Sequence, residues 1–96
     1  MKHRQIGDQV FFYRPNLHSF AFYGYWGKIS FIDNRNDILR YGDDANVFTV
    51  ENTFSSVDEA INACHKVYNS IDDKEKIVEE SYKLHLDFLT KEKDKI

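Results

Sequence analysis

Two adjacent aspartates in a short turn are the first residues of this sequence that could do chemistry. Asp43 and Asp44 follow Tyr41-Gly42, and paired carboxylates in a hairpin can hold two magnesium ions for phosphoryl transfer. Such a site needs a large supporting domain and a further carboxylate motif, and the 96-residue chain offers neither. We therefore interpret this motif as a solvated turn.

The segment from Asp33 to Asp44 has part of the spacing of a calcium-binding loop. Arg35 stands at the third position, where an oxygen ligand is needed, and Ile38 at the sixth, where glycine makes the turn. The twelfth position holds Asp44, which is shorter than the usual glutamate. The sequence therefore favours a hairpin turn, whose Asn and Asp side chains bond their own backbone, over a calcium site.

Cys64 and His65 are the only adjacent cysteine and histidine of the chain. Neighbouring residues of a helix point about 100° apart, so His65 cannot reach the thiol as a base. Cys64 also lies on an apolar stripe, which predicts an inert buried thiol. No two of the four histidines are spaced four residues apart. The sequence therefore predicts no catalytic residue, no cofactor and no metal ion, in a protein that is not an enzyme.

Length and composition are those of a single globular domain spanning residues 1–96. Of these residues, 42% are apolar, 30% charged and 16% aromatic, and the chain is too short for two cores. One cysteine excludes an internal disulfide and fits a reducing, cytoplasmic compartment. No apolar run approaches the length of a membrane span. A net charge of −3 argues against a DNA-coating protein.

The C-terminal part predicts a helical hairpin over residues 56–90, with a frayed tail at 91–96. Ser56 and Glu59 have the spacing of a capping box, and Asp72 with Glu75 repeats it at the start of a second helix. The second helix is apolar on more than one side, so it needs a further surface: the sheet, a second copy of the chain, or a partner. A homodimer through this helix is one expectation. The stripe of the first helix consists of Val57, Ala60, Ile61, Cys64, Val67, Tyr68 and Ile71.

The N-terminal part predicts β-structure over residues 6–52. We expect strands at 9–14 and 19–33, the second bent or broken at Gly24 and Gly27 because glycine tolerates a bulge. Further short strands are expected at 38–41 and 47–51. No linker separates the two parts, so the fold class is α+β: a small twisted antiparallel sheet or an SH3-like barrel, followed by a two-helix hairpin.

Both faces of the segment 19–33 carry large aromatic residues. Alternation places Tyr23 and Tyr25 on one face and Phe20, Phe22 and Trp26 on the other. Two helices cover only one face of an open sheet, so either the sheet is closed or otherwise covered, or one face is a binding surface. The candidate partner-binding residues are these aromatics with nearby cations: Phe20, Phe22, Tyr23, Tyr25, Trp26, Arg14, Lys28 and Arg35.

Three segments resemble small barrels of the SH3-like kind found in KOW and Tudor domains. They are Gly7-Asp8-Gln9-Val10, then Gly27 to Asp33, then Val47 to Glu51. The resemblance covers residues 7–51; the stretch 33–46 is longer than in such barrels, and the basic loops of nucleic-acid-binding members are missing. The resemblance implies a non-enzymatic binding module that takes its ligand at aromatic positions near strand ends.

The sequence thus predicts an interaction protein that occupies the surface of a protein partner. Such a small free-standing domain would also suit an inhibitor of a host enzyme, encoded by a phage or mobile element. The alternative is a nucleic-acid-binding SH3-like module that stacks bases on aromatics beside scattered arginines and lysines. Acids match those cations in the same half of the chain, so counterion release would be small.

Overall fold

The computed structural model describes residues 4–36, 38–43 and 46–95. In this part of the chain, strands precede two helices, which confirms the predicted α+β class. The residues divide into two compact units. Met1–Tyr13 and Gly24–Ser55 form the sheet unit, and Arg14–Tyr23 and Ser56–Ile96 form the helical unit. The loop 14–23 therefore belongs with the helices, although the sequence placed most of it in a strand.

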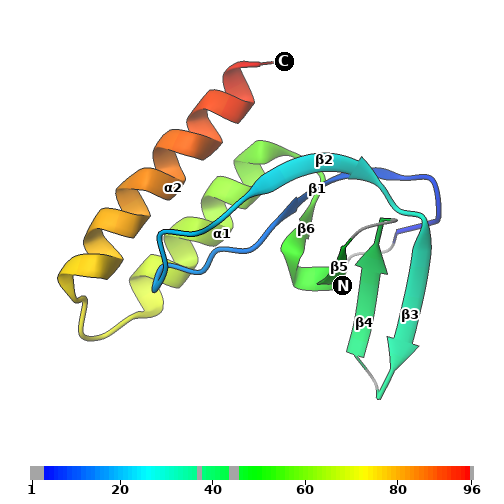
Figure 1. Cartoon of the computed structure of the whole chain (residues 1–96), viewed down its shortest axis with the longest axis horizontal. Helices are drawn as coiled ribbons and strands as arrows, with labels where there is room; N and C mark the ends of the chain where they lie inside the picture. Colours follow the sequence, from blue (N-terminus) through cyan, green and yellow to red (C-terminus); the bar gives the residue numbers. More distant parts are fainter. Residues whose placement is uncertain (1–3, 37, 44–45, 96) are drawn as a thin grey trace. The chain divides into compact units, whose positions relative to one another are not determined.

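The sheet unit contains two three-stranded antiparallel sheets (Figure 1). One sheet has the order β2-β1-β6 and the other β3-β4-β5. They are not closed into a barrel, so that predicted alternative is wrong. The other alternative, an open antiparallel sheet, is confirmed, with two small sheets in place of one. The elements are β1 (Gln9–Tyr13), β2 (Gly24–Lys28), β3 (Phe31–Arg35), β4 (Ile38–Gly42), β5 (Val47–Thr49), the 3-10 turn η1 (Val50–Asn52) and β6 (Thr53–Phe54).

The long segment breaks between β2 and β3 at Ile29-Ser30, not at the predicted glycines. The Ile29 amide donates to the Asp8 carbonyl at 2.9 Å, and the Ser30 amide donates to the Gly42 carbonyl at 2.8 Å. Ile29 is thus bonded to the residue before β1, and Ser30 is bonded to β4 of the other sheet. The chain therefore passes from one sheet to the other at these two residues. Gly27 lies inside β2, where an added Cβ would approach Phe12 Cε2 to 3.0 Å. Its role is close packing rather than bending.

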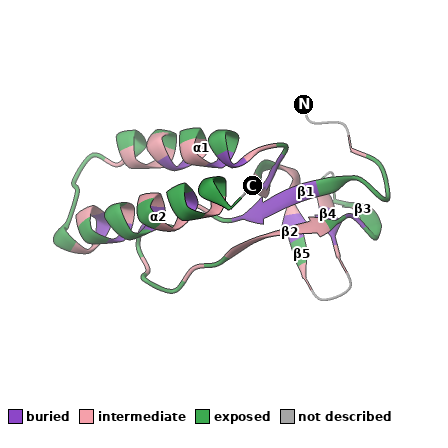
Figure 2. Ribbon diagram, turned by 90° about the horizontal axis from the view of Figure 1, so that it is seen from above, coloured by how far each residue is buried: buried purple, intermediate pink, exposed green. Residues whose placement is uncertain are grey.

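Aromatic rings fill the core of the sheet unit. Phe12 stacks on Phe48 with ring centroids 5.0 Å apart, and Tyr25 lies 5.4 Å from Phe12. On the other face of β1, Phe11 packs edge-on against Trp26 at 5.5 Å. Strand β1 is therefore buried on both faces from Val10 onward, as its colour in Figure 2 shows. The core cluster consists of Val10, Phe12, Ile29, Tyr41 and Phe48.

The helical unit contains α1 (Val57–Ser70) and α2 (Lys76–Asp94) side by side. The Ser56 hydroxyl accepts the Glu59 amide at 3.2 Å, which confirms the predicted cap of α1. The predicted start of the second helix at Asp72 is wrong, because α2 begins at Lys76 with no side-chain cap. Helix α2 also continues four residues past the expected end at 90. Neither described helix is long and apolar enough to cross a membrane.

The loop 14–23 is held against α2 by buried contacts. Leu17 is fully buried, and the Ser81 hydroxyl donates to the Ser19 carbonyl at 2.8 Å. Phe22 stacks on the His85 ring with centroids 3.8 Å apart. The aromatic alternation of this segment therefore comes from packing on a helix and not from a strand.

Burial makes the stability of the helical unit depend on pH through His85. Burial lowers the pKa of His85 below its ordinary value of 6.5, against hydrogen bonds to the Asn16 and Ser19 backbone, which raise it. The unfolded chain therefore binds a proton more readily than the folded chain, and stability falls as the pH drops below 6.5. The contribution of His85 is fully present above that pH.

We expect chemical denaturation monitored by circular dichroism to show this loss between about pH 7 and about pH 5. A His85→Gln variant keeps a hydrogen-bonding side chain without titration, so its stability should fall less over the same interval. A His18→Gln variant is the control, because His18 is an exposed histidine of the loop 14–23, which packs against α2. Equal pH dependence of wild type and His85→Gln would contradict the assignment to His85.

Candidate functional site

The outer face of the β3-β4-β5 sheet carries apolar and charged side chains, of which Asp33 and Arg40 are half-buried and the others exposed. Register places Phe31 opposite Gly42, which pairs in turn with Val47, and places Asp33 opposite Arg40. Residues that pair directly share one face of a sheet. The opposite face holds Tyr41 and Phe48, which are buried in the core. We call the outer set the sheet face: Phe31, Asp33, Arg35, Ile38, Arg40 and Val47.

The apolar residues of the sheet face remain open to solvent. Phe31 is 37% exposed, Ile38 44% and Val47 42%. The Phe31 ring lies across Gly42, because an added Cβ at Gly42 would come within 2.5 Å of Phe31 Cζ. Only glycine leaves room for the ring there. Phe31, Gly42 and Val47 thus form one continuous apolar row across the sheet.

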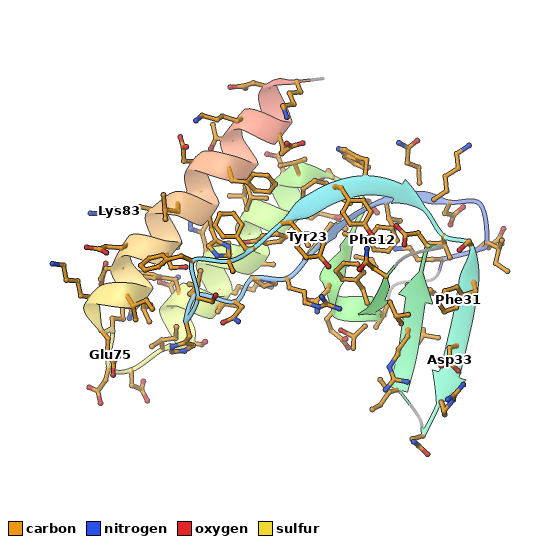
Figure 3. All side chains as sticks on the ribbon, viewed as in Figure 1. Phe12, Tyr23, Phe31, Asp33, Glu75 and Lys83 are labelled. Carbon is orange, nitrogen blue, oxygen red and sulfur yellow. The ribbon has the colours of Figure 1, made fainter. Side chains whose placement is uncertain are left out.

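Two arginines lie beside this row with a carboxylate between them. Asp33 Oδ2 is 3.7 Å from Arg35 Nε and 3.8 Å from Arg40 Nη1. These distances exceed those of charge-assisted hydrogen bonds, about 2.7–2.9 Å, so the pairs are loose. The Arg35 side chain is 75% exposed. Its guanidinium can therefore turn to an external carboxylate. Figure 3 shows Phe31 and Asp33 along strand β3.

The sheet unit does not bring its four predicted binding residues onto one surface. Tyr25 faces the core, and its hydroxyl donates to Asp43 Oδ2 at 2.6 Å. Trp26 lies on the opposite face of β2, partly buried against Phe11. Lys28 is exposed at the end of β2, and Arg35 alone belongs to the sheet face.

A second exposed surface lies in the helical unit, between the loop 14–23 and α2. An open groove of about 450 Å³ is lined by Phe20, Glu80, Lys83 and Leu84. Phe20 is 49% exposed and Leu84 48%. We call this the loop–helix groove. Lys83 points away from α2 in Figure 3.

The other predicted residues of the loop 14–23 have different environments. Tyr23 is 47% exposed and Arg14 is exposed. Phe22 packs against His85 and, edge-on, against Phe88 at 5.4 Å. It therefore contributes to packing of the helical unit, and Phe20 is the predicted aromatic that lines a groove.

Asp43 accepts hydrogen bonds within the predicted turn and from the neighbouring strand β2. Its Oδ1 accepts the Asn46 amide at 2.8 Å, and its Oδ2 accepts the Tyr25 hydroxyl. Asp44, the second acid of the motif, and Asp37 of the calcium-like segment lie outside the described residues. Within the described ranges, no three His, Cys, Asp or Glu residues are grouped so that they could hold a metal ion.

Two stacked tyrosines join α1 to α2. The rings of Tyr68 and Tyr82 are 3.9 Å apart and nearly parallel. The Tyr68 hydroxyl donates to both Glu79 carboxylate oxygens at 2.7 Å, and the Tyr82 hydroxyl is hydrogen-bonded to His65 Nδ1. The bond to Glu79 and desolvation raise the pKa of Tyr68, and burial raises the pKa of Tyr82. Both phenols therefore stay protonated and fasten the helices. Beside them, Cys64 is buried as predicted.

No protein-family model matches the chain, and neither a curated protein nor a solved structure matches it. The exposed surfaces of the chain itself are therefore the guide to its function. Sequence reasoning missed Phe31, Ile38, Val47 and Leu84. A signal for Phe31 and Ile38 was present: the hairpin turn predicted within 33–44 can pair 31–35 with 38–42, and alternation then places both residues on one face.

Proposed function

We propose that this protein is a non-enzymatic interaction module that binds a protein partner through the sheet face. The observation that carries the proposal is the exposed pair Phe31 and Val47, on either side of the buried Gly42, beside two loosely paired arginines. Aromatic residues and arginine are enriched at protein interfaces, where a few such side chains carry most of the binding energy. An enzyme bound in this way would be one case, as expected for an inhibitor.

The chemistry of the sheet face favours a partner with apolar side chains and a carboxylate. Apolar side chains would cover Phe31 and Val47, and the carboxylate would pair with Arg35. A nucleic acid fits less well. Asp33 lies between the two arginines and would face phosphates. Single-strand recognition relies on successive stacked bases, whereas Phe31 is the aromatic ring on this face.

The resemblance of residues 7–51 to SH3-like small barrels supports the same class of protein. Short strands lie in all three segments that carry the resemblance, β1, β3 and β5 among them. We propose a relationship with these binding modules as an open two-sheet variant.

Matched variants test this function by affinity purification with quantitative mass spectrometry. We expect Arg35→Glu and Phe31→Ser to reduce the recovery of a specific partner at least about tenfold, the effect of losing one interface anchor. Lys28→Glu reverses a charge and Leu84→Ser replaces an apolar side chain by serine at exposed positions off the sheet face, so both should retain the partner. Thermal unfolding of each variant checks that the fold is kept.

Two results would contradict the proposal. One is a partner that wild type and both sheet-face variants capture equally. The other is salt-steep binding to a single-stranded oligonucleotide that Arg35→Glu abolishes, because counterion release is the signature of phosphate recognition.

A further inference from the structure

We propose that two copies of this chain associate through antiparallel α2 helices that meet at the loop–helix groove. The proposal uses only the helical unit and is independent of partner binding by the sheet face. Its evidence is a charge pattern on α2 that complements itself when the helix is turned end for end.

The charge pattern is a single line of alternating charges along the exposed side of α2. Lys76, Glu80, Lys83 and Asp87 are spaced four, three and four residues apart, which keeps them on one stripe of a helix. The side chains of Lys76, Glu80 and Asp87 are 89%, 51% and 62% exposed. Within the stripe, Lys76 and Glu80 pair at 3.9 Å. Asp87 pairs at 3.0 Å with Lys91, one turn further along the exposed surface of α2. Both are exposed surface pairs, which yield readily to a better partner.

An antiparallel second copy matches this stripe charge for charge. When Glu80 faces Lys83 of the second copy, symmetry makes Lys83 face Glu80, and Lys76 then faces Asp87 in both directions. A register displaced by one helical turn would set Glu80 against Asp87 and Lys76 against Lys91. Repulsion in that register and attraction in the first select one alignment.

The same alignment places the apolar groove at the twofold axis. Glu80 and Lys83 line the groove together with Phe20 and Leu84, so the grooves of the two copies face each other. Phe20 and Leu84, each about half exposed, would be covered. Burial of these side chains drives the association, and the charge pairs set its orientation.

The contact is small, so the dimer should be weak. The facing stretch runs from residue 76 to residue 87, about 18 Å at about 1.5 Å per residue. Interfaces of this limited size hold transient complexes. We expect a dissociation constant on the order of tens of micromolar.

Charge reversal gives a decisive test by sedimentation velocity between about 5 µM and about 1 mM protein. Wild type should form dimers as concentration rises. Glu80→Lys alone places lysines opposite each other, and Lys83→Glu alone places acids opposite each other. Each variant should dimerise at least about tenfold more weakly than wild type. An equimolar mixture of the two should regain the dimer, because every reversed lysine then faces a glutamate.

The control is Lys66→Glu, which makes the same charge change as Lys83→Glu at an exposed position of α1 and should dimerise like wild type. Circular dichroism confirms that all variants keep their helices. A wild type that stays monomeric up to about 1 mM overturns the proposal. So does a mixture of the two reversed variants that remains as monomeric as each alone, since that result excludes the Glu80–Lys83 pairing.

Discussion

Replacing Phe12 with alanine should lower the free energy of unfolding of the sheet unit by about 3–5 kcal/mol. Phe12 is fully buried, and its ring lies between Phe48 and Tyr25, with centroids 5.0 and 5.4 Å away. It also fills the space above Gly27. Truncation leaves a cavity walled by rigid rings, which cannot collapse to fill it. Domains of this size have about 5–15 kcal/mol of stability, so the variant would lose a large fraction of it.

Fluorescence-monitored urea denaturation measures this effect. Trp26 is the only tryptophan of the chain and lies in β2, so its emission reports on the sheet unit. Phe31→Ala is the control, since the same truncation at a 37% exposed ring should cost clearly less. If Phe31→Ala destabilised the protein as much as Phe12→Ala, the division between core and sheet face would be wrong.

Leu17→Ala should lower the free energy of unfolding of the helical unit by about 2–5 kcal/mol, although Leu17 lies in a loop. Loop residues are ordinarily exposed, and substitutions there have small effects. Leu17 is fully buried within a segment whose neighbours Ser19 and Phe22 contact α2. We therefore expect its side chain to be part of the core of the helical unit.

Urea denaturation followed by far-ultraviolet circular dichroism, which is dominated by the helices, is the measurement. Phe20→Ala provides the comparison in the same loop. Its ring is 49% exposed, so the loss should be about 1 kcal/mol or less. Two equal, small losses would show that the loop does not share the core of the helices.

The sequence contained the local part of the fold. The apolar stripe and the Ser56 cap predict α1 and its start at Val57, because both depend on positions within one or two turns. The stripe extends to Ile71, one residue past the helix end at Ser70. The predicted start of the second helix at Asp72 was wrong. Asp72 and Glu75 have the residue types and spacing of a capping box, but the chain remains irregular until Lys76 and no side chain caps α2. Barrel closure failed for another reason: it depends on pairing between strands far apart in the sequence, which alternation does not specify.

The candidate surfaces were only partly predictable. Phe20 and Arg35 were predicted and lie on the groove and on the sheet face. The aromatic alternation of 19–23 indicated a strand, but the partner of Ser19 is Ser81, 62 residues away. No local pattern carries that information. The position of the Phe31 ring likewise depends on Gly42, its partner across the hairpin, which leaves room for the ring. Packing between distant residues therefore decides which aromatic side chains remain exposed to solvent.

The division of the chain between the two units has a consequence for dissecting the protein. The polypeptide passes from one unit to the other after Tyr13, after Tyr23 and after Ser55. Each unit is therefore discontinuous in sequence, like a domain that carries an insertion. A fragment beginning at Ser56 would hold both helices but lack Leu17 and the rest of the loop 14–23, which belong to the same unit. A fragment ending at Ser55 would keep the strands but expose the apolar side chains of residues 14–23, because the helices that this loop packs against would be missing. We expect neither fragment to fold stably without aggregating. To obtain the helical unit by itself, residues 14–23 would have to be joined to the two helices by circular permutation or fusion.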